Sequence, residues 1–166
     1  MKILKRILIA LACVFLIIQF IRPARNAPDG GSPNDISTKF NVPQDVQNIL
    51  RISCYDCHSN NTRYPWYAEV QPVGWWLNSH IQGAKRELNF SEFAGYRPRR
   101  QYIKLQQVVE QVSENEMPLP SYLIIHTDAR LSQQQKDRLT SWATAVRDSM
   151  KAVYPVDSLG KGRRGQ

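Results

Sequence analysis

Apolar side chains recur every three or four positions in several stretches of the chain, and this spacing predicts helices. Val46, Ile49 and Leu50 follow the pattern and indicate a short helix over 43–53. The other expected helices cover 73–88, 98–114 and 132–152, with a single helical turn near 121–126. No stretch alternates apolar and polar residues in the way a half-buried strand does. The sequence therefore predicts an all-α fold.

Two sequence features mark the borders of the last helices. The prolines of Met117-Pro118-Leu119-Pro120 remove backbone donors and disfavour helical geometry before them, so an ordered loop is expected there. Ser132 and Gln135 have the spacing of a capping box and predict the start of the final helix. The inner face of that helix is expected to consist of Leu139, Trp142, Ala143, Val146 and Met150.

Residues 1–27 carry the pattern of an export signal or a membrane anchor. Lys2, Lys5 and Arg6 precede an apolar run over 7–21. A fifteen-residue helix is about 22 Å long, which is short for a bilayer, so length alone does not separate signal from anchor. No well-formed cleavage site follows, which favours an uncleaved anchor. Basic residues on the amino side favour placement of the following chain outside the cytoplasm.

The remaining residues are enough for one domain with a hydrophobic core. Pro, Gly, Asn, Asp and Ser dominate residues 28–38, which we expect to form a flexible linker. The working domain is expected over 39–153, where most of the predicted helices lie. Residues 154–166 combine turn residues with basic charge and are expected to form a disordered basic tail.

The charge of the chain points away from nucleic acid once it is located along the sequence. The formal net charge is +8, but five basic residues without an acid lie in 1–27, and three more lie beyond residue 160. Residues 28–160 hold fourteen basic and fourteen acidic side chains. A neutral domain provides no long-range field of the kind that draws phosphate backbones.

The five residues from Cys54 to His58 carry the main chemical signal. They form a Cys-x-x-Cys-His motif, in which two thiols can add to the two vinyl groups of one haem. The histidine that follows then reaches the iron. We therefore expect one covalently attached haem c, with Cys54 and Cys57 as thioether anchors and His58 as the proximal iron ligand.

Three other interpretations of the two cysteines remain open from the residues alone. A thioredoxin-type redox pair needs a βαβ setting, which the pattern does not provide. A structural zinc site needs four ligands, and no second cysteine pair is present. A disulfide between Cys54 and Cys57 would close a small strained ring and leave His58 unexplained. The expected export favours haem, because haem is attached to such motifs outside the bacterial cytoplasm.

An iron held by His58 needs a second axial ligand or an open face. The candidates are Met117, His80 and His126. Met117 lies in a proline-rich loop rather than on a helix face, where packing would explain a methionine, so we expect Met117 to be the distal ligand. A thioether ligand raises the reduction potential, which suits an electron carrier. His80 is expected to lie in the core on the stripe through Trp76.

Aromatic residues follow the motif closely. Candidates for the walls of a flat haem site are Tyr64, Trp66, Trp75 and Trp76. Arg63 and Lys85 are candidate partners for haem carboxylates, although placement on the surface is the better explanation for each.

These residues together resemble the bacterial haem-binding domain family over about residues 35–152. The resemblance is carried by the run from Cys54 to Tyr67 and by Gln71-Pro-Val-Gly-Trp-Trp, His80-Ile81, Leu88-Asn-Phe-Ser, Met117-Pro-Leu, Ser121-Tyr122, His126, Ala129 and Leu131-Ser132. It implies a small exported monohaem domain that is helical like cytochrome c. It also implies that Cys54 and Cys57 anchor the haem, with His58 proximal and Met117 distal.

The expected function is single-electron transfer between redox partner proteins, not enzymatic catalysis. A haem enzyme such as a peroxidase, or a haem-based gas or redox sensor with an open distal site, remains the alternative. We expect the domain on the periplasmic side of the inner membrane, held there by its N-terminal segment or released by cleavage.

Overall fold

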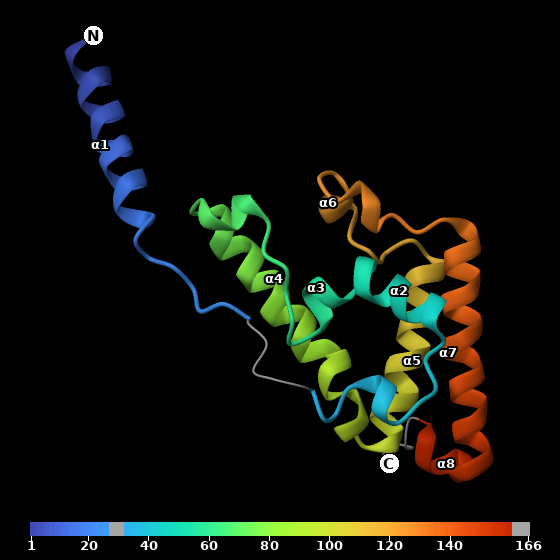
Figure 1. Cartoon of the computed structure of the whole chain (residues 1–166). Helices are drawn as coiled ribbons and strands as arrows, with labels where there is room; N and C mark the ends of the chain where they lie inside the picture. The colour runs from blue at the N-terminus through green and yellow to red at the C-terminus, as the bar shows by residue number, and fades with distance from the viewer. Residues whose placement is uncertain (27–31, 161–166) are drawn as a thin grey trace, which may run out of the picture.

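The computed structural model describes residues 1–26 and 32–160, and its regular elements are helices joined by loops (Figure 1). About 69% of the described residues are helical and none lies in a strand, which confirms the all-α prediction. The elements are α1 (Lys2–Ile18), η1 (Ile36–Thr38), α2 (Gln44–Ser53), α3 (Tyr55–His58), η2 (Trp66–Glu69), α4 (Val73–Glu87), η3 (Phe90–Gly95), α5 (Pro98–Ser113), α6 (Pro120–Leu123), η4 (Thr127–Ala129), α7 (Gln133–Val153) and α8 (Val156–Leu159).

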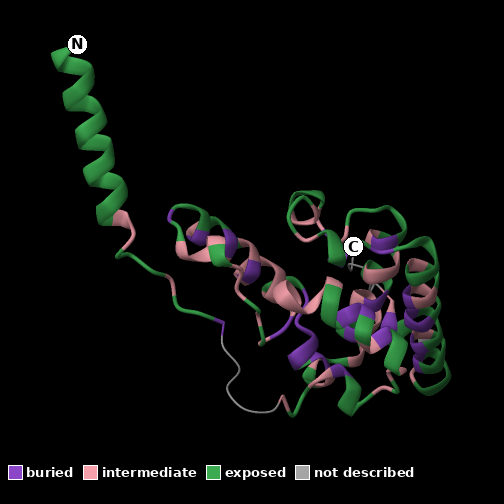
Figure 2. Cartoon of the chain, turned by 45° about the horizontal axis from the view of Figure 1, so that its top comes forward, coloured by how far each residue is buried: buried purple, intermediate pink, exposed green. Residues whose placement is uncertain are grey.

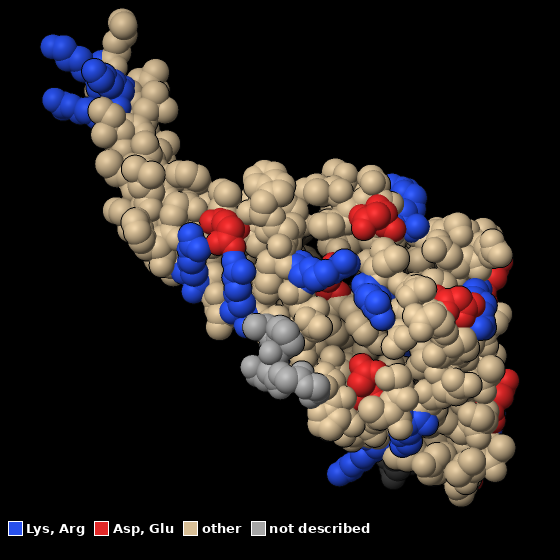
Figure 3. Space-filling view, viewed as in Figure 1, with Lys and Arg blue, Asp and Glu red and all other residues tan. Residues whose placement is uncertain are grey.

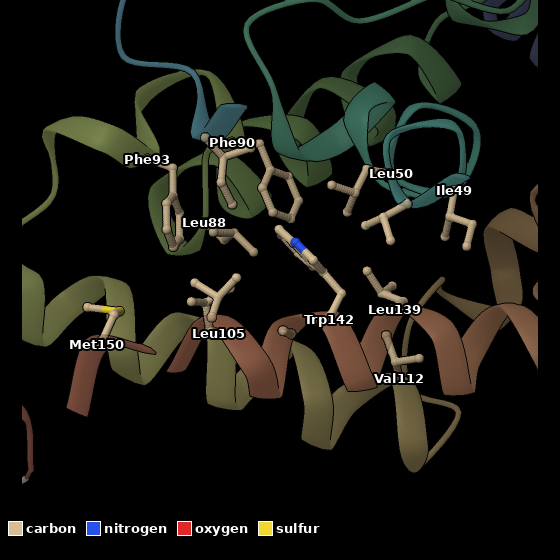
Figure 4. Close-up of a cluster of buried hydrophobic side chains, with 14 of the residues drawn as sticks. Ile49, Leu50, Leu88, Phe90, Phe93, Leu105, Val112, Leu139, Trp142 and Met150 are labelled. Atoms are coloured by element: carbon tan, nitrogen blue, oxygen red, sulfur yellow. The ribbon is translucent and has the colours of Figure 1, made fainter. Parts of the chain in front are cut away.

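The hydrophobic core lies where α5 and α7 pack side by side beneath α2 and η3 (Figures 1 and 4). Trp142 points from α7 toward Phe90, and its Nε1–H donates to the carbonyl of Asn41 at 3.0 Å. All five residues expected on the inner face of the final helix are buried, namely Leu139, Trp142, Ala143, Val146 and Met150. The apolar stripe of α7 therefore fixes that helix against the rest of the domain.

The helix borders follow the local chemistry that the sequence predicts. Ser132 caps α7 by accepting from the Gln135 N–H at 3.2 Å, and the Gln135 side chain accepts in return from the Ser132 N–H at 2.9 Å. This is a complete capping box. Pro98 occupies the first turn of α5, where its missing N–H costs no helical bond.

Both ends of the domain extend further than expected. Ile36 in η1 is fully buried in the core, so the ordered domain begins inside the expected linker 28–38. Leu159 in α8 is also buried in the core, so the expected disordered tail is ordered at least that far. In both places an apolar side chain among turn residues packs into the core. Residues 27–31 and 161–166 lie outside the described part.

The expected stripe on α4 is wrong by one register. Leu77 and Ile81 face the interior, whereas Trp76 is 49% exposed. Gly74 is buried as well. The backbone of Ala68 comes so close that a Cβ at Gly74 would lie 2.3 Å from the Ala68 carbonyl oxygen. The face of α4 that carries Gly74 therefore packs against η2 and the interior.

The apolar run at the N-terminus forms α1, none of whose residues is buried (Figure 2). Lys2, Lys5 and Arg6 lie at its free end (Figure 3). Among the described residues, no helix combines the length and the apolar character needed to cross a membrane.

The segment after α1 lies against the domain. Gln19 and Gln71 exchange two hydrogen bonds, from the Gln19 amide to the Gln71 carbonyl at 3.1 Å and from the Gln71 N–H to Gln19 Oε1 at 2.9 Å. The Trp75 indole N–H donates to the carbonyl of Ile21 at 2.7 Å. These contacts fix the end of α1 to η2 and α4.

Candidate functional site

A cavity of about 320 Å³ lies between the motif helix α3, the end of α4 and one face of α5. Cys54, His58 and Met117 all line it, although Met117 follows His58 by fifty-nine positions. Cys57 is partly buried in the same turn of helix but is not among the lining residues. The other lining residues are Ser53, Glu87, Leu88, Phe90, Lys104, Gln107, Val108, Glu110, Gln111, Val112 and Pro118.

His58 ends α3 and is fixed by a backbone group. Its Nδ1 lies 2.9 Å from the carbonyl oxygen of Leu88. A carbonyl only accepts, so Nδ1 carries the proton and Nε2 keeps its lone pair. The ring also packs edge-on against Phe90, with centroids 6.4 Å apart. The imidazole therefore has the tautomer and the fixed orientation that a metal ligand needs.

The environment keeps this imidazole neutral. Burial lowers the pKa of His58, and the positive charge of Lys104 acts in the same direction. Hydrogen bonds to the backbone around Leu88 and Ala84 oppose that shift, but burial is the larger effect. A neutral ring is the form that binds a metal ion.

The two thiols of the motif are free and protonated. Burial raises the pKa of Cys54 to about 12, and burial together with the Asp56 carboxylate raises the pKa of Cys57 to about 11. Redox-active dithiols have lowered thiol pKa values instead. Among the residues that the structure describes, no group of three or more His, Cys, Asp or Glu side chains could hold a metal ion. Neither the redox pair nor the zinc site thus gains support here.

Met117 reaches the cavity because of how α5 ends. Asn115 adopts a left-handed conformation with φ of 62°, and its N–H donates to Val112 at 3.3 Å. The next N–H, of Glu116, donates back to the carbonyl of Gln111 at 2.9 Å. This pair of bonds is a Schellman motif, which reverses the chain directly after the helix. Asparagine tolerates the left-handed conformation better than most residues do.

The two rival ligands lie elsewhere. His80 is on α4, where its Nδ1 donates to the carbonyl of Trp76 at 2.9 Å and its ring packs on the Trp76 ring. The Nε2 of His126 lies 2.8 Å from the hydroxyl oxygen of Tyr67. Neither histidine lines the cavity that His58 and Met117 share.

The basic residues proposed as partners of the haem carboxylates, Arg63 and Lys85, do not line the cavity. Arg63 pairs with Asp56 at 3.2 Å, and Lys85 donates to the side chain of Asn26. The basic side chain that does line the cavity is Lys104, which was not singled out from the sequence. It is only 14% exposed and pairs with Glu87 at 2.9 Å. No pattern in the sequence distinguishes it from the other lysines on the helices.

The aromatic candidates do not wall the cavity. Trp66 is 78% exposed, and Trp76 points outward beside His80. Phe90 provides the aromatic wall instead. The clustering of aromatic residues after the motif therefore did not predict which aromatic side chain lines the cavity.

Comparison with known proteins supports one assignment. No curated protein and no solved structure matches the chain. The family model described as a haem-binding domain matches residues 13–145, which include the motif, the loop of Met117 and most of α7. The chain belongs to the haem-binding domain family.

Proposed function

We propose that the protein is a monohaem c-type cytochrome that transfers single electrons. The observation that carries the proposal is that His58 and Met117, distant in sequence, line one cavity beside Cys54. In this proposal Cys54 and Cys57 would form the thioethers, and His58 and Met117 would bind the iron. When bound, the haem supplies the one-electron couple of its iron.

The residues present fit a haem. The donor set has two unpaired thiols in one turn of helix, a neutral imidazole with its Nε2 available, and a thioether. The cavity volume lies within the range of sites for small molecules and cofactors. Its walls combine Leu88, Phe90 and Val108 with several polar side chains, as an amphipathic macrocycle requires.

The chain itself contributes orientation, burial and charge. The Leu88 carbonyl holds His58 in one tautomer, which also increases the basicity of the ligating nitrogen. The buried apolar walls exclude water, which tunes the reduction potential. Lys104 adds a positive charge close to the metal-binding side chains, which disfavours the oxidised state.

An electron carrier is favoured over an enzyme or a sensor because a protein side chain is available for each axial position. A peroxidase or gas sensor needs an open distal face. Here Met117 lines the cavity, and His126, the other candidate ligand, is bonded to Tyr67 outside it.

Location and partners follow the sequence pattern of the N-terminus. The basic residues and apolar run of 1–21 support export to the periplasmic side of the inner membrane. Covalent haem attachment also takes place there. The partners proposed are redox proteins of the same compartment.

The test is covalent retention of haem. The full chain is produced in a bacterial host with haem-attachment machinery, and its haem is extracted with acidified acetone. We expect the haem to remain with the protein, and to be lost to the solvent in the double variant Cys54→Ser/Cys57→Ser. Cys13→Ser is the matched control, because that thiol is exposed on α1. Complete extraction of haem from the wild-type protein contradicts the proposal.

A further inference from the structure

The segment that follows Met117 receives little support from apolar packing. Pro118 is buried, but no residue of 119–126 is. Ile124 is 78% exposed and Ile125 is 59% exposed. Backbone hydrogen bonds of the segment are local, such as that from the His126 N–H to the Tyr122 carbonyl at 3.1 Å. Side-chain contacts must therefore contribute to its position.

Two side-chain hydrogen bonds tie this segment to α3 and η2. The Tyr122 hydroxyl donates to Asp56 Oδ2 at 3.1 Å. The Tyr67 hydroxyl and His126 Nε2 form a second bond at 2.8 Å. The two bonds reinforce each other, because the rings of Tyr122 and His126 are stacked, with centroids 4.1 Å apart and planes 10° apart. We call this pair of bonds the loop latch.

One end of the loop latch lies inside the Cys-x-x-Cys-His motif. Asp56 occupies a variable position of the motif, and its Oδ1 accepts from the Arg63 backbone N–H and from Arg63 Nε, both at 3.2 Å. Its carbonyl accepts from the Thr62 hydroxyl at 2.7 Å. The carboxylate that receives Tyr122 is thus held in place before the bond forms.

The chemistry of the Tyr122 bond suits a stable contact. Burial and the neighbouring Asp56 carboxylate raise the pKa of Tyr122, so the phenol keeps its proton and remains a donor. A hydrogen bond to a carboxylate is among the stronger kinds in proteins.

We propose that Tyr122 and Tyr67 are positioning residues that hold the loop 117–126 closed, so that Met117 stays beside the site of His58. This inference rests on the proposed function for the role of Met117. It adds that the haem-attachment helix itself, through Asp56, controls how firmly the distal ligand is held.

The variants Tyr122→Phe and Tyr67→Phe remove one hydroxyl each and keep the ring. Tyr64→Phe is the matched control. Its hydroxyl accepts from the Asn26 N–H at 2.7 Å, on the same side of the motif, but it does not reach the loop. All measurements use the full chain as produced with haem. The wild type, the single variants, the double variant Tyr67→Phe/Tyr122→Phe and the control are compared.

Two measurements are made. Hydrogen exchange followed by mass spectrometry reports opening of the loop in peptides that cover 117–126, with peptides of α5 and α7 as internal references. Titration of the ferric protein with imidazole reports how easily an external ligand replaces Met117. Loss of the Tyr122 bond to the Asp56 carboxylate corresponds to about a tenfold change in either equilibrium, and loss of the Tyr67 bond to His126, which involves no carboxylate, to about a fivefold change.

We expect exchange in 117–126 to be about tenfold faster in Tyr122→Phe and about fivefold faster in Tyr67→Phe, with a larger effect in the double variant. Imidazole binding should become correspondingly tighter in each, and Tyr64→Phe should be unchanged. Unchanged exchange in the double variant overturns the inference. Faster exchange with unchanged imidazole binding also overturns it, because the loop then opens without releasing Met117. Exchange does not require haem, so a chain without covalent haem contradicts the proposed function while the loop latch is still tested.

Discussion

The Nδ1–H of His58 donates to the carbonyl of Leu88, thirty residues further along the chain. The acceptor is a backbone group, so no side-chain substitution at Leu88 removes it. Leu88 is itself buried in the core, which fixes the position of its carbonyl. The orientation of the proposed proximal ligand is thereby built into the fold, whereas that of Met117 depends on a loop.

The first prediction concerns the distal ligand. We expect Met117→Ala to abolish the charge-transfer absorption of a methionine-ligated ferric haem and to lower the reduction potential, because the thioether favours the ferrous state. The side chain of His80 does not line the cavity, so His80→Ala is the control and is expected to retain the absorption. Absorption spectra of the two variants check this. An unchanged spectrum for Met117→Ala transfers the role to another residue.

The second prediction concerns the buried cation Lys104. Its ammonium disfavours the more positive ferric state, so Lys104→Met is expected to lower the reduction potential. An interaction of about 1 kcal/mol corresponds to roughly 40 mV for one electron. Lys151→Met makes the same charge change at an exposed position on α7 and should leave the potential nearly unchanged. Potentiometric titration measures both, and Lys104→Arg should restore the wild-type value.

The third prediction concerns the pH dependence of thiol reactivity in the chain before haem is attached. With pKa values of about 12 for Cys54 and about 11 for Cys57, the reactive thiolate grows only as pH rises toward those values. At pH 8 about one Cys57 side chain in a thousand is ionised. We expect iodoacetamide to modify the exposed Cys13 first and the motif cysteines far more slowly. Mass spectrometry follows the reaction, and rapid modification of all three at pH 8 would contradict the burial described.

The fourth prediction contrasts two tryptophans. Trp142 is 5% exposed, and Trp142→Ala removes its packing and its bond to Asn41, which should lower the free energy of unfolding by about 3–5 kcal/mol. Trp66 is 78% exposed, and Trp66→Ala should change it by less than about 0.5 kcal/mol. Urea unfolding followed by circular dichroism compares them. Equal losses would show that Trp66 packs against something.

The fifth prediction contrasts two glycines of α4. Gly74→Ala places a methyl group 2.3 Å from the Ala68 carbonyl oxygen, so we expect a loss of about 1–3 kcal/mol in the free energy of unfolding. At Gly83 the nearest atom is the end of the Arg86 side chain at 3.9 Å. Gly83→Ala should therefore stabilise the helix by up to about 1 kcal/mol. The same unfolding measurement serves both, and opposite signs are the expected result.

Periodicity predicted the helices well because the core of this domain is built from helix faces. The stripe of α7 and the capping box at Ser132 depend only on residues close together in sequence. The register of α4 was missed because its inner face is decided by contact with Ala68, which no local pattern reveals. Ile36 and Leu159 were missed for the same reason, since each is an isolated apolar residue that finds its place only in the folded core.

The motif made Cys54, Cys57 and His58 visible from sequence, and proline-rich surroundings indicated Met117. The partners of these residues were not visible. Leu88 contributes a carbonyl, which every residue has, and Lys104 looks like any other lysine on a helix. The Tyr122 contact with Asp56 joins positions sixty-six residues apart, and only the fold brings them together.

The two hydrogen bonds between Gln19 and Gln71 give the end of α1 a defined position against the domain. Arg22 and the neighbouring Arg25 both pair with Glu69 and brace the same joint. The direction of the α1 axis and the direction of the turn from Cys54 to His58 are therefore coupled through these contacts, so that the orientation of one determines that of the other.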